Sequence, residues 1–184
     1  MMTVTGSPEQ GFVERVEKLD GGRLAMLRRG CGKRDPVEGR CSWLIGLIRG
    51  AASEPVAFLT ASLLAQYKTA NIRTGHHRAE GNFGSTWKLV IENDKRKLKS
   101  LPRRFSKLLD AEYDPWTGDG DLPYRLRQMI RYAASKNVGV DWPKLLADLK
   151  SWSRPEKYVQ KRWARSCFAK GQLPEEAPEP EGEE

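Results

Sequence analysis

Apolar residues recur every three or four positions along most of the chain, which is the spacing of one face of an α-helix. In one clear case Leu101, Phe105, Leu108 and Leu109 fall on a single arc at about 100° per residue. Period-two alternation, which marks a β-strand, is short even in its best example, WKLVI at residues 87–91. The pattern therefore predicts an all-α fold. The expected helices cover residues 8–19, 22–29, 37–49, 54–70, 84–93, 101–111, 122–137, 142–152 and 154–170.

Proline residues mark several of the expected helix starts. Proline lacks a backbone donor and is tolerated in the first turn, where a preceding Ser or Asp accepts hydrogen bonds from the free N–H groups. Ser7-Pro8 has this form, and Ser7 with Gln10 and Ser153 with Glu156 also fit the capping-box pattern. The Ser/Asp-x-Pro pattern occurs at residues 53–55, 100–102, 121–123, 141–143 and 153–155.

The expected helices divide into two groups along the chain. Short connections join the last four helices, which favours an antiparallel bundle. We therefore expect two small helical bundles packed as a two-lobed protein. The N-terminal lobe is expected over residues 7–94 and a C-terminal four-helix lobe over residues 98–173. Residues 174–184 are acidic and rich in Pro, and we expect them to be a disordered tail.

The charge of the chain favours a polyanionic partner. The 184 residues include 32 Lys and Arg against 24 Asp and Glu, which gives a formal net charge of +8. Six of the Glu lie in the tail beyond Leu173, so the rest of the chain is more positive than the total indicates. Nucleic acid fits such a field better than an anionic membrane surface does. No apolar run approaches the roughly 20 residues of a membrane span, and MMTVTGSPEQ lacks the features of a signal peptide.

The cysteines and histidines do not form a recognisable metal-binding pattern. Cys31 and Cys41 are too far apart for a zinc knuckle, and Cys167 lies far from both. An odd number of scattered cysteines favours a reducing, cytoplasmic setting. His76 and His77 are adjacent in a polar loop, where neighbouring side chains point in different directions. We expect no metal site and no cofactor.

Basic residues gather opposite the apolar arcs of the expected helices. Residues 95–107 contain seven Lys and Arg and no acidic residue, whereas a solvated helix face usually mixes the two signs. The repulsion among these charges makes more sense if an external polyanion neutralises them, so we expect contact with nucleic acid. Arg grips phosphate with paired hydrogen bonds and without reading the base sequence. The basic faces include Arg28, Arg29, Arg103, Arg104, Lys107, Arg125, Arg127 and Arg131, and a further stripe contains Lys157, Lys161 and Arg165.

The tryptophans are expected to serve mainly as core residues. Trp142 lies between Asp141 and Pro143, where it is expected to staple a helix start. Trp116 lies in a loop and remains open as a base-stacking residue. Four others fall on apolar arcs: Trp43, Trp87, Trp152 and Trp163.

An acidic loop is the one feature that points toward catalysis. Asp114, Asp119 and Asp121 are close in sequence, as the carboxylates of a metal-dependent nuclease would be. The spacing does not match a calcium-binding loop. Asp121 is better explained as a helix cap and GDGD as a turn. We therefore expect no catalytic residue.

Four segments resemble CasB, the small subunit of the type I-E CRISPR Cascade surveillance complex. They are LAMLRRG at 24–30, GNFG at 81–84, LPYRLRQMIRYA at 122–133 and VDWPKLLADLKSW at 140–152. The similarity runs over roughly residues 12–170, in the same order and with compatible spacing. It implies an all-helical, two-lobed and non-catalytic protein.

The resemblance also implies partners. Two copies would lie head to tail inside the complex, beside the backbone subunits that hold the CRISPR RNA and in contact with the large subunit. They would stabilise the opened DNA, in which the guide pairs with the target strand and the other strand is displaced. The motif positions assign phosphate contacts to Arg28, Arg29, Arg125 and Arg127, and a matching basic pair adds Arg103 and Arg104. Lys107 and Arg131 rest on helical geometry alone.

Three other functions remain open at this point. The chain would fit a stand-alone helical nucleic-acid-binding regulator, a metal-dependent nuclease, or a purely structural subunit whose charges meet acidic protein surfaces. A separate hypothesis concerns the tail. Its glutamates, Glu175–Glu184, would mimic nucleic acid and shield the basic surface before assembly.

Overall fold

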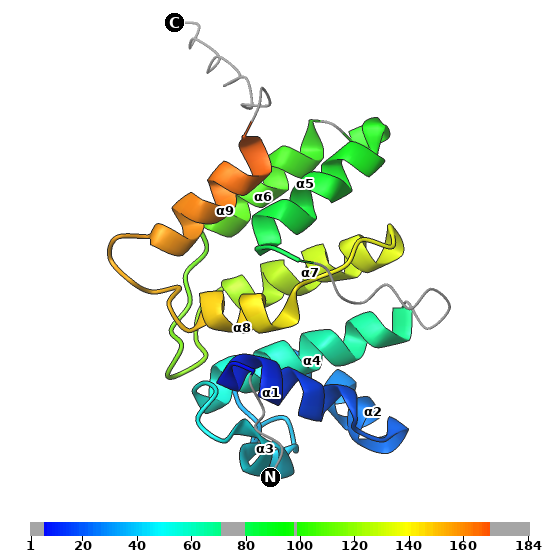
Figure 1. The fold of residues 1–184 in the computed structure, drawn as a ribbon, viewed down its shortest axis with the longest axis vertical. Coiled ribbons are helices and arrows are strands. Elements are labelled where there is room, and N and C mark those ends of the chain that lie inside the picture. The colour runs from blue at the N-terminus through cyan, green and yellow to red at the C-terminus, as the bar shows by residue number, and fades with distance from the viewer. Residues whose placement is uncertain (1–5, 71–79, 98, 170–184) are drawn as a thin grey trace, which may run out of the picture.

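The computed structural model describes residues 6–70, 80–97 and 99–169, and within these ranges the protein is helical (Figure 1). An isolated bridge between Cys31 and Lys33 is the one β feature of the described residues. The predicted all-α fold is therefore confirmed. The α-helices are α1 (Pro8–Glu17), α2 (Gly21–Gly30), α3 (Ile45–Ile48), α4 (Glu54–Ala70), α5 (Phe83–Asn93), α6 (Ser100–Leu109), α7 (Leu122–Ser135), α8 (Trp142–Leu149) and α9 (Tyr158–Phe168), and the 3-10 helices are η1 (Ser42–Leu44) and η2 (Lys95–Lys97).

The helices follow one another in levels along the long axis of the molecule (Figure 1). Helices α1, α2 and α3 lie at one end, and α5, α6 and α9 lie at the other. Between them, α4 packs against α2 on one side and against α7 and α8 on the other. Helix α5 makes its most extensive contact with α9, although the two are far apart in the sequence.

The core of the described residues is continuous. Helix α4 is buried from Pro55 to Ala65 because it has neighbours on several sides, and it is correspondingly apolar around its circumference. The buried apolar residues from α1 to α9 form a single cluster. The division into lobes at residues 94–98 stays a prediction. None of the described helices is long and apolar enough to cross a membrane.

Most of the predicted core tryptophans are buried. Trp87, Trp152 and Trp163 lie in the core, and each donates its indole N–H to an oxygen of another segment. Trp142 is also fully buried, at the start of α8. The prediction for Trp43 is only partly correct, because this side chain is half-buried at the edge of the core.

The crossing of α5 and α9 depends on Gly84, in the GNFG segment. A Cβ atom at this position would lie 2.1 Å from the backbone oxygen of Trp163. Glycine thus allows the two helices to approach until their backbones touch. Next to it, Phe83 packs on the Trp163 ring with 5.3 Å between ring centroids.

Two of the predicted helix caps form as expected. The Ser7 hydroxyl accepts from the backbone N–H of Gln10 at 3.2 Å, and the Asp141 carboxylate accepts from that of Lys144 at 3.0 Å. The capping box at Ser7 is half formed, because the structure shows no hydrogen bond from the Ser7 backbone N–H to the Gln10 side chain, whose amide donates to Glu14. These side chains fix the starts of α1 and α8.

The predicted helix over residues 37–49 is wrong in its first half. The Asp35 carboxylate accepts from two backbone N–H groups that follow it, so the chain turns here, and Arg40 has a φ of 57°. Gly39 packs on the ring of Phe58, where a Cβ would lie 2.2 Å from the nearest ring atom. Tertiary packing therefore selects a loop, and helical structure begins only at Ser42.

The predicted helix over residues 154–170 begins late. Helix α9 starts at Tyr158, after Lys157 has adopted a left-handed conformation with a φ of 48°. The predicted capping box of Ser153 and Glu156 is therefore wrong. The backbone N–H of Lys157 closes a turn before the helix rather than extending it.

Candidate nucleic-acid interface

The basic face of α6 is exposed because its apolar face is buried. Leu101 and Phe105 are fully buried, which turns Arg104 and Lys107 toward solvent. These two cations line a hollow of about 300 Å³ together with Arg125 of α7. Its remaining lining residues are Trp87, Tyr124, Gln128, Met129 and Tyr132. Residues that the sequence places on separate helices thus meet at one site.

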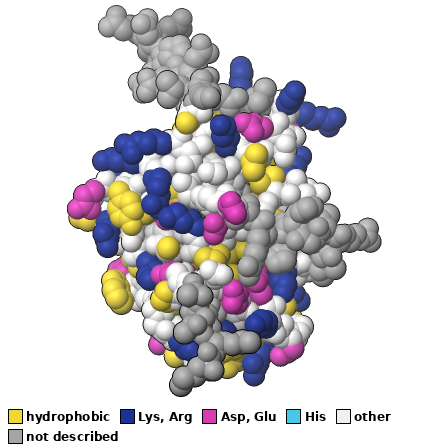
Figure 2. Space-filling view, viewed as in Figure 1, with side chains coloured by type: hydrophobic (Ala, Val, Ile, Leu, Met, Phe, Trp, Pro, Cys, Tyr) yellow, Lys and Arg dark blue, Asp and Glu magenta, His cyan; other side chains and the backbone are white. Residues whose placement is uncertain are grey.

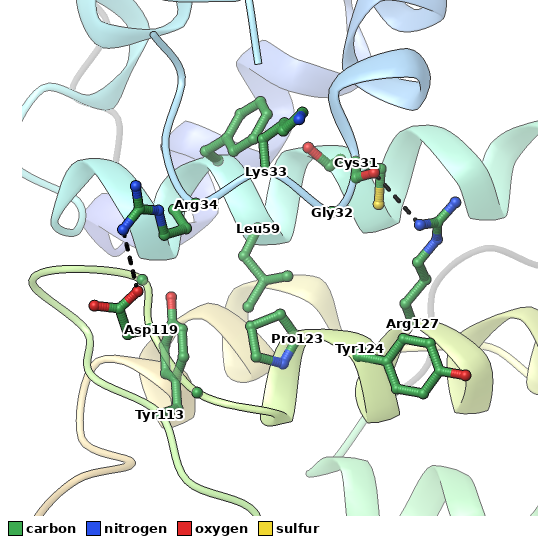
Figure 3. Close-up of a pocket in the computed structure, with 14 residues that line it drawn as sticks. Cys31, Gly32, Lys33, Arg34, Leu59, Tyr113, Asp119, Pro123, Tyr124 and Arg127 are labelled. Carbon is green, nitrogen blue, oxygen red and sulfur yellow. Dashed lines mark hydrogen bonds and ion pairs between the residues drawn. The ribbon is translucent and has the colours of Figure 1, made fainter. Parts of the chain in front are cut away.

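A second hollow, of about 400 Å³, lies on the other side of Tyr124 (Figure 3). Arg127 of α7 faces Cys31 across it and donates to the Cys31 carbonyl oxygen at 3.4 Å. Lys33 and Arg34 enter from the loop that follows α2. Its inner wall is formed in part by α4, which therefore positions the loop against α7.

Two further hollows adjoin the first two. One, of about 490 Å³, is lined by Arg29, Lys33 and Arg40. The other, of about 600 Å³, lies at the end of α5 and is lined by the basic residues Lys95, Arg96, Lys97 and Lys136.

Neighbouring hollows share a lining residue, so these four adjoin one another. Lys33 lines the first pair, Tyr124 the middle pair and Tyr132 the last pair. We call the surface of these four hollows the basic groove. Its basic residues are Arg29, Lys33, Arg34, Arg40, Lys95, Arg96, Lys97, Arg104, Lys107, Arg125, Arg127 and Lys136. Its acidic residues are Glu38, Glu92, Asp94 and Asp119.

Some cations of the basic groove are already paired. Arg34 contacts both Glu38 and Asp119, the latter at 3.4 Å, and Arg125 pairs with Asp121 at 2.5 Å. By contrast, no ion pair is found between Arg104 or Lys107 and the other described residues. The hollow that these two residues line is also the one of the four without an acidic lining residue. Unpaired cations on one surface are the kind of site that suits an anionic polymer.

Elsewhere the signs are mixed. Figure 2 shows Lys and Arg side chains interspersed with Asp and Glu over the face seen in Figure 1. Lys150 pairs with Glu9 at 2.7 Å, and Lys144 lies 3.8 Å from Asp148. This is the pattern expected of a solvated surface, and it contrasts with the basic groove.

The structure brings together five of the eight predicted phosphate-binding residues. Arg29, Arg104, Lys107, Arg125 and Arg127 line the basic groove. Their juxtaposition fits the predicted role, which itself stays a prediction.

The other three predicted residues do not line the basic groove. Arg28 is half-buried and donates to the hydroxyl of Thr69 at 2.7 Å. Arg103 and Arg131 are exposed on α6 and α7. Each lies one helical turn from a lining residue, so both flank the basic groove.

Among the residues that line the basic groove, sequence reasoning missed Lys33, Arg34, Arg40, Lys136 and Tyr124. Lys33 and Arg40 lie in the loop that was predicted in part as helix, and this loop reaches α7 only through tertiary contacts. Tyr124 lies within the LPYRLR segment, directly before the predicted phosphate-binding residue Arg125, but an exposed aromatic residue gives no distinct signal in a single sequence.

One end of the basic groove contains a carboxylate, that of Asp94, whose pKa is lowered by its neighbours. Lys136 lies 2.8 Å from Asp94, and the Tyr132 hydroxyl also donates to it. Hydrogen bonds from Lys136 and then from Tyr132 hold the pKa of Asp94 at about 2. The pair raises the pKa of Lys136 in turn. These contacts tie α7 to the end of α5.

The three loop aspartates are engaged in separate local contacts. The Asp114 carboxylate accepts from backbone N–H groups of its own turn, and Asp119 pairs with Arg34. Asp121 pairs with Arg125 and accepts from the backbone N–H of Glu112 at 2.9 Å. The prediction that Asp121 caps α7 is partly correct, because Asp121 occupies the N-cap position but its side chain accepts no hydrogen bond from the first turn of the helix.

Among the described residues, no group of three or more His, Cys, Asp or Glu is placed to hold a metal ion. His76, His77 and the acidic tail lie outside the described residues.

Comparison with known proteins identifies the family. Residues 23–168 match the family model of CRISPR-associated protein Cse2. A CRISPR-associated protein Cse2 from Thermus thermophilus is 32% identical over 119 residues, which is 65% of this chain. The matched region spans 59% of that relative's length.

Solved structures share the fold. CasB from M. ruber superposes with a TM-score of 0.69 at 29% identity, covering 89% of this chain and 93% of that one. A chain of a CRISPR RNA-guided surveillance complex gives a TM-score of 0.71 at 20% identity, covering 88% and 92%. At that lower identity the likeness shows the fold alone. The chain thus belongs to the CRISPR-associated Cse2 family, and the resemblance to CasB is confirmed.

Proposed function

We propose that this protein is a non-catalytic scaffold subunit of a type I-E Cascade complex, in which it holds nucleic acid by its phosphates. The observation that carries this proposal is the basic groove, which gathers cations from α2, α6, α7 and two intervening segments onto one surface. Membership of the Cse2 family supports the assignment to an RNA-guided complex.

The mechanism is electrostatic and geometric. When the guide RNA pairs with the target strand, the other DNA strand is displaced and can rewind with its complement. Binding of the displaced strand, or of the backbone of the guide–target hybrid, in the basic groove makes rewinding less favourable. Because the target has no fixed sequence, the contacts must be to phosphates, and Arg104, Lys107 and Arg127 are well suited to this task.

The proposed partners follow from family membership. They are the CRISPR RNA, the target and displaced DNA strands, the backbone subunits, the large subunit and a second copy of this chain. A fold shared with a chain of a CRISPR RNA-guided surveillance complex supports this placement.

The test is the salt dependence of binding to single-stranded DNA of arbitrary sequence. We expect Arg104→Glu/Lys107→Glu to weaken binding and to flatten the slope of log affinity against log salt by about 0.7 for each phosphate that is no longer bound. The matched control is Lys18→Glu/Arg154→Glu, which reverses two exposed charges outside the basic groove. It should leave the slope close to that of the wild type.

Three results would overturn the proposal. If the two double variants changed the affinity and the salt slope equally, the basic groove would not be the surface that binds nucleic acid. Affinity confined to one DNA sequence would favour a stand-alone regulator. Salt-sensitive binding to protein partners without nucleic-acid affinity would favour a purely structural subunit.

A further inference from the structure

We propose that Tyr124 stacks on an unpaired nucleobase and gives the basic groove a preference for single-stranded over duplex nucleic acid. This inference rests on the proposed function, because it requires a strand in the basic groove. It adds a contact to the base, which is distinct from the contacts to phosphate.

Tyr124 is held on the surface by the residues around it in the sequence. Leu122 and Leu126 are fully buried and fix the rotation of α7, so the position between them faces outward. The Tyr124 side chain is 68% exposed. The structure shows no hydrogen bond or ring contact between Tyr124 and another described residue, whereas the Tyr67 and Tyr132 hydroxyls both donate to protein oxygens. An aromatic face in water is available to a partner.

The position of Tyr124 is the strongest part of the argument. Tyr124 lines both central hollows of the basic groove, so a strand that follows the basic groove must pass over it. Arg127 lies on one side, as Figure 3 shows, and Arg125 lines the hollow on the other. Arg104 and Lys107 complete that second hollow. Phosphates held on the two sides would place the intervening nucleotide over the tyrosine ring.

Stacking distinguishes single strands from duplexes for a simple reason. In a duplex each base is already stacked and paired, and its faces are hidden. An unpaired base offers a free face, and stacking on an aromatic ring tolerates every base. A displaced DNA strand and an unpaired stretch of guide RNA share this chemistry, so DNA and RNA probes are needed to separate the two sources.

The experiment measures binding of the full chain to an adenine oligonucleotide and to its abasic counterpart of equal length, as DNA and as RNA. The wild type is expected to bind the adenine strand roughly 10-fold more tightly than the abasic strand. Tyr124→Ala should abolish this difference without changing the salt slope, and Tyr124→Phe should retain it. A 2-aminopurine base in the strand should be quenched by the wild type and by Tyr124→Phe but not by Tyr124→Ala.

Two results would overturn the stacking proposal while leaving the proposed function intact. The first is an equal loss of affinity for the adenine strand and the abasic strand in Tyr124→Ala. The second is a Tyr124→Phe variant that binds as Tyr124→Ala does, which would assign the effect to the hydroxyl. If the wild type binds neither strand, the proposed function fails and the stacking proposal fails with it.

Discussion

The indole N–H of Trp163 donates to the buried carboxylate of Asp148 at 2.6 Å, which links α9 to α8 beneath the surface. Arg162 and Lys144 contact the same carboxylate from its solvent side. One acidic side chain therefore joins α8, which packs on α1 and α4, to α9, which packs on α5 and α6.

Replacing Asp148 with Ala should destabilise the protein. The Trp163 N–H would be left buried without an acceptor, which costs about 1–3 kcal/mol of unfolding free energy. Asp148→Asn keeps an oxygen acceptor and should lose less. The measurement is urea denaturation followed by tryptophan fluorescence. Asp110→Ala, at an exposed acidic position, is the control and should stay within about 0.5 kcal/mol of the wild type. A stability of Asp148→Ala equal to that of this control would contradict the prediction.

Gly84→Ala should separate α5 from α9. The added Cβ would collide with the Trp163 backbone oxygen, and relief requires movement of a whole helix, so we expect a loss of about 1–3 kcal/mol or more. Gly46→Ala is the matched control. A Cβ there meets nothing within 4 Å, and Ala favours the helix by roughly 0.5–1 kcal/mol. The midpoint temperature of unfolding should therefore fall for Gly84→Ala and rise for Gly46→Ala. A shift in the same direction for both variants would contradict the close crossing of α5 and α9.

Lys33→Glu should weaken nucleic-acid binding although Lys33 lies outside every helix. It lines two of the four hollows, so reversal of its charge acts at the point where they join. The salt slope on single-stranded DNA should flatten by about 0.7 if one phosphate is no longer bound. Lys18→Glu provides the same charge change on an exposed site outside the basic groove. An effect of Lys33→Glu no larger than that of Lys18→Glu would show that the strand does not pass this loop.

Stability should fall in acid through the titration of Asp94. Its pKa is about 2 in the folded protein, below the ordinary value of 3.8, so the folded state binds fewer protons than the unfolded chain does in this window. The contribution of Asp94 is therefore present above pH 3.8 and is lost as the pH falls toward 2. Asp94→Asn lacks this titration. The difference in urea midpoint between the wild type and Asp94→Asn should shrink over this range, and a constant difference would exclude the effect.

Truncation after Leu173 should strengthen DNA binding at low salt. The removed residues include six Glu and no basic residue, so the remaining chain has a larger positive charge. The effect should diminish as added salt screens the charges. A tail in which the six Glu are replaced by Gln is the control for chain length, and it should bind as the truncated chain does. Unchanged affinity after truncation would end the hypothesis that the tail shields the basic surface.

Much of the fold could be predicted because local signals and burial agree. The segment at residues 54–70 is apolar and follows a Ser-x-Pro start, and α4 has those bounds. The inward face of α7 was likewise predicted, because Leu126, Met129 and Ile130 recur at helical spacing and are all buried. In these segments the local sequence pattern and the tertiary contacts favour the same structure.

The errors occur where distant contacts decide the backbone. Gly39 packs on Phe58 of another element, and no local pattern reveals this contact. For the same reason the basic groove was only partly predicted. Helical spacing indicated that Lys107 and Arg127 point outward, but only the packing of α4 against α2 and α7 brings Lys33 to the same surface.

The burial of α4 has a mechanical consequence for ligand binding. A helix packed on several sides cannot bend or slide without breaking many contacts, so the span between the α2 loop and α7 is set before any ligand arrives. In the proposed complex the protein would act as a fixed template, and the bound strand would adjust its own path to the protein.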